Sequence, residues 1–454
     1  MDLIQRFSQW YEENSSQIRE NYFRFLSFPS VSTDPERSQD VLSCANFLIE
    51  YLNKSGLKAE QISTPGFPVV YAEEMGAGPK APTILMYGHY DVQPADPLEL
   101  WTSPPFEPTE REGKVFARGA ADNKGQIFYA CMAIIAWKAL HGILPVNIKF
   151  CIEGEEESAS KGLLKALPSL KKKLAADVAL IVDFDSMQDG TPAITLGARG
   201  CMGMEVTFKG SFLDLHSGSL GGLAYNPNRA LAEVLAKLWD GEGSVAVPGF
   251  YEGVKEPSEE EMQRFTFRMD EEALQKDFGI KALGKEKHRT LKESNWFRPT
   301  IEINGMFGGY TGAGVKTVIP AHSTAKLTCR LVPGQDCAHI ARVVEAFIRS
   351  QAPKGMEVEF TYQGGLGAYR SDIEAPLVKA LGQATSEVVG KKSICALAGG
   401  SIPIGGELQR ELGIEVIGMG FGLPTDAIHS PNEHFDMHRF KQGFLTVARM
   451  LECI

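Results

Sequence analysis

Short polar clusters at five places in the chain contain side chains that can bind metal ions and transfer protons. They read GHYDVQP, RGAADNKG, EGEEESAS, IVDFDS and DAIHSPNEHF, and they begin at Gly88, Arg118, Glu153, Ile181 and Asp426. Imidazole and carboxylate ligands suit zinc, manganese or cobalt better than calcium or a thiolate zinc site. Carboxylates crowded together raise one another's pKa, and divalent cations remove that repulsion. The clusters therefore indicate a site for divalent metal ions.

Four of the clusters also have a structural explanation that involves no chemistry. His89 and Asp91 could form a surface pair, and a run of glutamates is usually solvated. Asp122 could cap the helix that follows it, and His429 could be a turn residue. Most of the clusters, however, directly follow an apolar run with the length of a strand. This placement favours one shared site.

The first 200 residues predict strands that alternate with helices. The expected strands cover 81–92, 146–154 and 178–184, and the expected helices cover 125–140 and 161–174. Such alternation is typical of parallel βαβ units in an open α/β sheet. Because ligands bind beyond the carboxyl ends of the strands in these sheets, we expect the polar clusters to meet at one edge.

The middle of the chain predicts a second kind of structure. Strand and helix patterns follow in the order β-α-β-β-α-β, the split βαβ unit of ferredoxin-like domains, between residues 203 and 365. A charged stretch at 240–298 interrupts the unit, and we interpret it as a partly helical elaboration with a solvated face. We therefore predict an open, mostly parallel α/β catalytic domain from residues 1–202 and 368–454, with an α+β lid domain inserted at 203–367.

Composition narrows the classes of protein to consider. The chain has 454 residues, 43% of them hydrophobic and 23% charged, with a net charge of −11. These are globular values, and an acidic chain is not expected to bind nucleic acid. No apolar run approaches the roughly 18–20 residues that span a bilayer, so no membrane association is expected. The eight cysteines form no CxxC pair, which is typical of a reducing compartment and predicts a cytoplasmic protein.

The sequence resembles the dinuclear zinc metallopeptidases that include carnosinase, carboxypeptidase G, acetylornithine deacetylase and succinyl-diaminopimelate desuccinylase. Besides the clusters, the strings WTSPPFEP, PAITLGARG, DLHSGSLGG, KTVIP, CRLVP and GGSIP carry the resemblance, from about residue 80 to 435. DLHSG, KTVIP, RLVP and GGSIP are shared most closely with the carnosinase-like dipeptidases. The resemblance implies a metallopeptidase in which a two-metal-activated water hydrolyses the amide bond of dipeptides.

The resemblance also implies roles for individual residues at the metal site. One ion would be held by His89, Asp122 and Asp183, and a second by Asp122, Glu157 and His429, so that Asp122 bridges the two. Zinc is the expected metal, with manganese or cobalt as alternatives. Glu156 would be the general base, and Asp91 would orient His89. A cis peptide bond is expected between Asp122 and Asn123.

Four further residues are implied to act on the substrate. His216 of DLHSG would stabilise the oxyanion from the partner subunit, so we expect a homodimer formed through the inserted domain. Arg330 would bind the substrate carboxylate, while Thr317 and Ser401 would add hydrogen bonds. Structural alternatives are that His216 is a surface helix cap and that Arg330 is a strand residue paired across the lid.

Competing functions stay open at this point. An N-acyl-amino-acid deacylase or a carboxypeptidase could use the same scaffold, although in this family Asp at position 183 accompanies dipeptidases and aminopeptidases. An inactive relative acting as a binding protein is a second alternative. A serine hydrolase that uses Ser401 or Ser217 is disfavoured, because GGSIP is not a GxSxG elbow.

Overall fold

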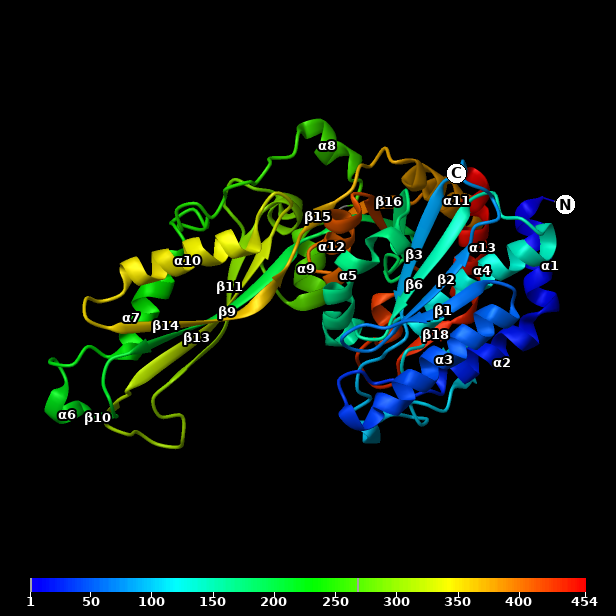
Figure 1. Cartoon of the computed structure of the whole chain (residues 1–454). Coiled ribbons are helices and arrows are strands. Elements are labelled where there is room, and N and C mark those ends of the chain that lie inside the picture. The colour runs from blue at the N-terminus through cyan, green and yellow to red at the C-terminus, as the bar shows by residue number, and fades with distance from the viewer. Residues whose placement is uncertain (1, 268) are drawn as a thin grey trace.

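A computed structural model describes residues 2–267 and 269–454 and shows two parts side by side (Figure 1). The larger part is built on a nine-stranded sheet, and the smaller part on a four-stranded sheet. No helix among the described residues is long and apolar enough to cross a membrane.

The nine-stranded sheet has the order β1-β2-β6-β3-β7-β17-β8-β15, and β16 pairs with β8. Its neighbours β6, β3, β7 and β17 run parallel, whereas the β1-β2, β2-β6, β17-β8 and β15-β8 pairs are antiparallel. The strands are β1 (Lys58–Ile62), β2 (Val69–Glu74), β3 (Thr83–His89), β6 (Asn147–Glu153), β7 (Val178–Ile181), β8 (Ala193–Ala198), β15 (Tyr369–Arg370), β16 (Ile394–Ala398) and β17 (Glu415–Met419). The predicted α/β class is confirmed. The sheet as a whole is mixed, because antiparallel pairs flank its parallel centre.

Helices cover both faces of this sheet, because successive residues of its buried strands point to opposite sides. Ile84 and Met86 belong to the core under one set of helices, while Leu85 and Tyr87 belong to the core under the other. The first set contains α1 (Leu3–Glu13), α2 (Ser15–Leu26), α3 (Ser38–Lys54), α4 (Lys124–His141), α11 (Pro376–Val389) and α13 (Met437–Cys453). The second set contains α5 (Lys161–Leu174) and α12 (Pro403–Leu412).

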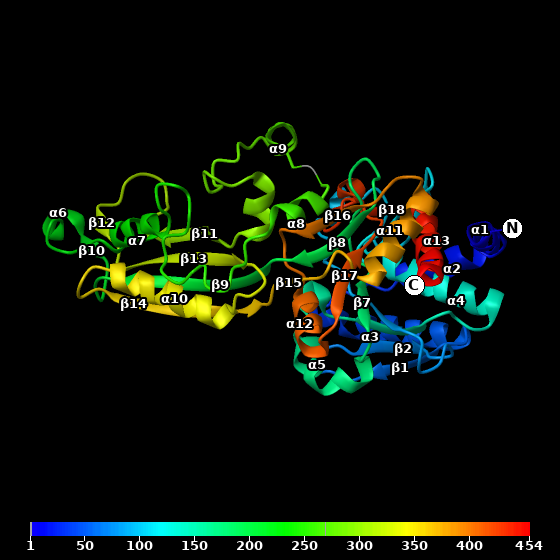
Figure 2. The ribbon, with the colours of Figure 1, turned by 90° about the horizontal axis from the view of Figure 1, so that it is seen from above.

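The smaller part has the predicted β-α-β-β-α-β order. It contains β9 (Gly200–Lys209), α7 (Pro227–Leu235), β11 (Thr300–Gly308), β13 (His322–Leu331), α10 (Cys337–Gln351) and β14 (Glu357–Leu366). The antiparallel sheet has the order β11-β13-β9-β14. Alternate β9 residues, Met202 to Phe208, are buried in a core shared with α7 and α10. At its far end (Figures 1 and 2) lie β10 (Leu215–His216), α6 (Ser217–Leu220) and β12 (Val318–Ile319).

The charged stretch at 240–298 is partly helical, with α8 (Glu259–Arg264) and α9 (Glu271–Phe278). It is not merely a solvated elaboration, because Phe265, Trp296 and Phe297 are buried in the core of the larger part. These aromatic residues alternate with charged runs, which mask their apolar pattern in the sequence. The inserted chain is therefore docked on the larger part.

The chain crosses between the two sheets at two places. It leaves between β8 and β9, at Arg199, and returns between β14 and β15, at 367–368. The predicted domain limits, 202/203 and 367/368, lie beside these crossings and stay predictions. A third small sheet, β18-β5-β4, contains β4 (Thr109–Arg111), β5 (Lys114–Phe116) and β18 (His434–Asp436).

Candidate metal centre

The carboxyl ends of three neighbouring parallel strands supply the first side chains of the site. His89 is the last residue of β3, Glu153 is the last residue of β6, and Asp183 lies two residues beyond β7. Strand β3 lies between β6 and β7, so these ends meet at one edge, where α/β sheets bind ligands. The expected convergence of the clusters is therefore present.

Asp122 lies at the centre of two groups of potential metal ligands. Its Oδ1 is 3.1 Å from His89 Nε2, and its Oδ2 is 2.9 Å from His429 Nε2. His89 Nε2 also lies 3.5 Å from Asp183 Oδ2, and His429 Nε2 lies 3.4 Å from Glu157 Oε2. In each group, His89-Asp122-Asp183 and Asp122-Glu157-His429, the ligand atoms all lie within 4.8 Å of one another. One carboxylate thus faces both groups with different oxygens.

The electrostatic environment of the two imidazoles is strongly negative. Asp122 and Glu157 raise the pKa of His429 to about 10. Burial would lower the pKa of His89, but Asp183, Asp122 and Asp91 raise it well above the usual value. The carboxylates that favour positive charge on both imidazoles also attract metal cations.

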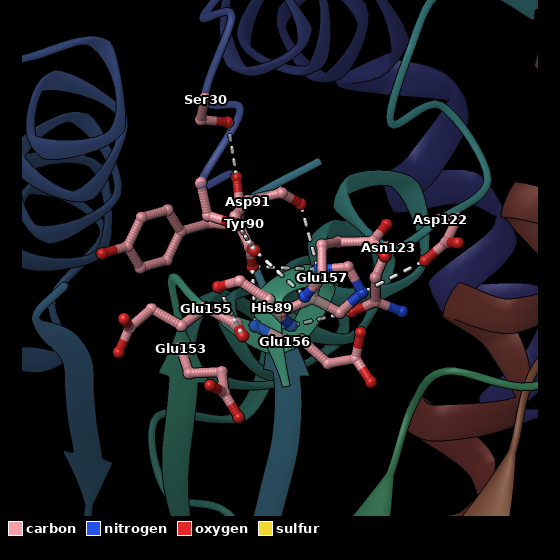
Figure 3. A network of polar contacts seen from close by, with 12 residues as sticks. Ser30, His89, Tyr90, Asp91, Asp122, Asn123, Glu153, Glu155, Glu156 and Glu157 are labelled. Atoms are coloured by element: carbon pink, nitrogen blue, oxygen red, sulfur yellow. Dashed lines mark hydrogen bonds and ion pairs between the residues drawn. The ribbon is translucent and has the colours of Figure 1, made fainter. Parts of the chain in front are cut away.

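Asp91 lies on the other side of His89 (Figure 3). Its Oδ1 is 3.4 Å from His89 Nδ1, while the Asp91 backbone oxygen is 3.0 Å from the same nitrogen. The Asp91 carboxylate accepts hydrogen bonds from the backbone N–H groups of Glu156 and Glu157, at 3.2 and 3.1 Å, and from Ser32 Oγ at 2.6 Å. Asp91 therefore positions both the imidazole of His89 and the turn that carries Glu156 and Glu157.

Glu156 and Glu157 lie in a single 3-10 turn, Glu156–Ser158, which follows the end of β6 at Glu153 after a two-residue gap. Glu157 faces His429, and its Oε2 accepts a hydrogen bond from Gln93 at 2.7 Å. Glu156 belongs to neither ligand group but lines the same cleft. Burial raises the pKa of Glu156 well above its usual value. The charge of His89 offsets part of this rise, and the charges of Asp183, Glu157 and Asp122 add to it.

Two residues without a predicted role hold the candidate ligands in place. Glu433 is fully buried and accepts hydrogen bonds from Arg118 and from the backbone N–H groups of Gly119, Ala121 and Asp122, at 2.8 to 3.0 Å. In the sequence, Glu433 belongs to the cluster DAIHSPNEHF. The signal for its role is its place in AIHSPNE, four residues after His429.

Asn123 is the second such residue. Its Oδ1 accepts the backbone N–H of His89 at 3.1 Å, and its Nδ2 donates to Asp183 Oδ1 at 2.8 Å. Gly88 makes room for it, because a side chain there would lie 2.6 Å from Asn123 Oδ1. The Asp122–Asn123 peptide bond is cis, as the resemblance implies.

The structural alternatives for His89, Asp91 and Asp122 are wrong, whereas the one for His429 is true but incomplete. His89 and Asp91 are fully buried, so they are no surface pair. Helix α4 begins after Asn123, and Asp122 faces the two imidazoles instead of capping it. His429 does occupy a turn, with φ at 57°, and the same turn directs its ring at Asp122.

A cleft of about 350 Å³ opens over these residues. Its lining includes Asp122, Glu156, Glu157, Asp183, Asp185, Gly400, Ser401 and His429. Arg330, near the end of β13, donates a hydrogen bond to Ser401 Oγ at 2.8 Å. The structure thus brings Arg330 of the smaller part to the edge of the cleft. The hydrogen-bond partner of Ser401 is a guanidinium and no base, which gives no support for Ser401 as the nucleophile of a serine hydrolase.

His216 and Thr317 are not brought to this cleft. Both lie at the far end of the smaller part, where β10 pairs with β12 (Figures 1 and 2). The backbone N–H of Ser217 donates to the Thr317 carbonyl at 3.1 Å, and the exposed His216 ring accepts from the Gly218 N–H. His216 does cap α6, as the structural alternative held. Its distance from its own cleft agrees with a role in a partner's site, which stays a prediction.

Comparisons with known proteins find similar chains among metallopeptidases. DUG1, a Cys-Gly metallodipeptidase of Candida albicans, is 30% identical over 97% of this chain and 95% of its own length. The human Beta-Ala-His dipeptidase is 32% identical over 84% of this chain and 76% of its own. An M20 family metallo-carboxypeptidase from Sulfolobus solfataricus has a TM-score of 0.84 at 32% identity, covering 96% of this chain and 98% of that chain.

Residues 85–452 of the chain match the description Peptidase family M20/M25/M40. This range contains each of the candidate ligands. The protein therefore belongs to peptidase family M20/M25/M40.

Proposed function

We propose that this peptidase hydrolyses the amide bond of dipeptides with two divalent metal ions. The observation that carries the proposal is the position of Asp122, which offers one oxygen to each of two ligand groups. A carboxylate shared in this way suits a pair of cations. The dipeptidases among its relatives, DUG1 and the human Beta-Ala-His dipeptidase, support dipeptides as the substrate class.

The donor set fits divalent metal ions, because each group combines one imidazole with two carboxylates. His89, Asp122 and Asp183 would hold one ion, and Asp122, Glu157 and His429 the other. Zinc is our first choice, with manganese and cobalt as alternatives. Bound there, the ions would polarise the scissile carbonyl and make hydroxide available near neutral pH.

The residues of this chain supply the remaining steps. Glu156 lines the cleft without belonging to either ligand group, so its carboxylate is free to accept the proton of the attacking water. It then returns that proton to the leaving amine nitrogen. Arg330 and Ser401, which are hydrogen-bonded to each other at the edge of the cleft, receive the substrate carboxylate.

We further propose a homodimer through the smaller part, in a cytoplasmic protein. His216 and Thr317 would enter the cleft of the second copy, since both lie remote from their own. The exposed apolar side chains Phe212, Leu223 and Val315 flank β10, α6 and β12, and such side chains mark interaction surfaces when they gather. All eight cysteines are free, which supports a reducing compartment.

A carboxypeptidase is the second candidate, because the metallo-carboxypeptidase from Sulfolobus solfataricus superposes on nearly the whole chain. The experiment that decides is a panel assay of dipeptides, longer peptides and N-acetyl amino acids on zinc-reconstituted protein. The proposal predicts the highest kcat/KM for dipeptides and complete loss of turnover with a chelator. Faster turnover of longer peptides or N-acetyl amino acids, or chelator-resistant turnover, would contradict it.

A further inference from the structure

Asp185 is a carboxylate of the catalytic cleft to which neither the ligand groups nor the proton transfer assign a task. It lies two residues after Asp183 and lines the cleft with Glu156 and His429. It belongs to neither group of ligand atoms. Within residues 2–267 and 269–454, its side chain has no hydrogen-bond or ion-pair partner. A half-buried carboxylate without a partner is costly. Its place in the cleft therefore indicates that it binds a cationic ligand.

The backbone around Asp185 is built to hold this carboxylate in one position. Asp185 forms a parallel bridge with Gly422, and the Ser186 N–H donates to the Gly422 carbonyl at 2.8 Å. The Ser186 hydroxyl donates to the Gly420 carbonyl at 3.2 Å. A side chain at Gly422 would place its Cβ 2.1 Å from Asp185 Oδ1. Gly422 therefore supplies the space that the carboxylate occupies.

The guanidinium of Arg439, whose charge acts on Asp185, is already engaged elsewhere. Arg439 donates to both oxygens of the buried Asp426, at 2.6 and 2.5 Å, and to the Phe421 carbonyl at 2.7 Å. These contacts satisfy Asp426 and leave Asp185 without a counter-ion. Asp185 is therefore an available negative charge beside the candidate metal centre, whereas Arg330 presents a positive charge next to Ser401 at the edge of the same cleft.

We infer that Asp185 binds the ammonium group of the residue on the amino side of the scissile bond. The inference rests on the proposed dipeptidase function and deepens it. A free dipeptide carries an ammonium at one end and a carboxylate at the other, so Asp185 and Arg330 would select it from both ends. An N-acyl amino acid has no such ammonium and would leave Asp185 unpaired. Asp185 is thus a specificity-determining residue against acylated substrates.

The test compares Ala-Ala with propionyl-alanine, which has the same shape without the ammonium. In the wild type, Ala-Ala should have the higher kcat/KM, by about 10- to 100-fold. In Asp185→Asn, that preference should fall by about tenfold or more, through loss of activity on Ala-Ala alone. A second pair, Lys-Ala and norleucyl-Ala, shows whether a side-chain ammonium also binds. Preference lost only in this second pair would assign Asp185 to the side chain.

Two controls separate this inference from other roles of Asp185. Metal content should be unchanged in Asp185→Asn, and Asp189→Asn, an exposed change in the same segment, should leave the preference as in the wild type. Equal loss on Ala-Ala and propionyl-alanine, an unchanged preference in both pairs, or loss of metal would overturn the inference. If the wild type does not hydrolyse Ala-Ala at all, the proposed function itself has failed.

Discussion

At the scale of single residues, the site depends on the hydrogen bonds that fix the backbone of Asp122. Asp122 faces two imidazoles while its backbone N–H is held by Glu433. Glu433 in turn satisfies three backbone donors and one guanidinium. A carboxylate is needed there because all of its partners are donors. The orientation of Asp122 therefore depends on a residue that touches no candidate ligand except through the backbone.

Glu433→Gln tests this dependence. The amide nitrogen of glutamine would meet backbone N–H donors, so the variant should lose about 3 kcal/mol of unfolding free energy and part of its metal content. Denaturant unfolding and metal analysis measure both effects. Glu99→Gln, at an exposed position, is the matched control. Wild-type stability in Glu433→Gln would refute this role.

Glu153, buried at the end of β6, makes stability depend on pH. Burial raises the pKa of Glu153 to about 8, and its Oε1 accepts from Tyr87 at 2.5 Å and Ser160 at 2.9 Å. Between about pH 4.5 and pH 8 the folded protein keeps a proton that the unfolded chain has lost. This stabilising contribution is therefore complete below about pH 4.5 and is lost as the pH rises to about 8.

Glu153→Gln keeps the neutral form at every pH. The unfolding free energy of the wild type should fall between about pH 5 and pH 8. The fall should be smaller in Glu153→Gln, by up to about 4 kcal/mol. Urea unfolding of metal-free protein at the two pH values measures the difference, with the exposed Glu107→Gln as control. Parallel pH dependence in wild type and variant would show that Glu153 does not keep its proton.

At the scale of elements, the parallel strands and the turn after β6 form the frame of the site. Asp91 follows β3 and accepts the backbone N–H groups of Glu156 and Glu157. It thereby couples the end of one strand to the turn after the next. Replacing Asp91 should disturb the ligand and the base together.

Asp91→Ala should lower both metal affinity and kcat by about 10- to 100-fold. Chelator competition and steady-state kinetics measure the two quantities. Ser32→Ala removes only one donor to the same carboxylate and should have a smaller effect on each. Normal metal affinity together with normal kcat in Asp91→Ala would show that the turn after β6 keeps its position without Asp91.

The same elements show what sequence reasoning can and cannot reach. Strands β3, β6 and β7 were predictable because each is a short apolar run followed by polar ligands, and parallel topology makes their ends meet. The contacts of Glu433 join segments more than 300 residues apart, and no local pattern encodes them. The burial of Phe265 and Trp296 was hidden by the charges around them.

At the scale of the whole molecule, the distance between His216 and its own cleft requires an explanation. The smaller part carries Arg330 at the end near the cleft and His216 at the opposite end (Figure 2). We therefore predict that one copy uses its own Arg330, whereas His216 serves the cleft of a second copy. The elongated shape predicts active sites that are shared between two subunits.

Mixing two inactive variants tests shared sites. Glu156→Gln should lower kcat by about 10²- to 10⁴-fold with metal retained, and His216→Ala should also be impaired. In mixed dimers one cleft has its own Glu156 and the partner's intact His216, so activity should return to about half of the wild type per dimer. A mixture no more active than its components would place His216 outside catalysis in the second subunit.

The central claim is that Asp122 bridges two cations at the strand ends. Anomalous diffraction from crystals of zinc-reconstituted protein measures this directly. We predict two peaks about 3.5–4 Å apart, one beside His89 and Asp183, the other beside Glu157 and His429, each within bonding distance of an Asp122 oxygen. A single peak, or a second peak away from Asp122, would contradict the account.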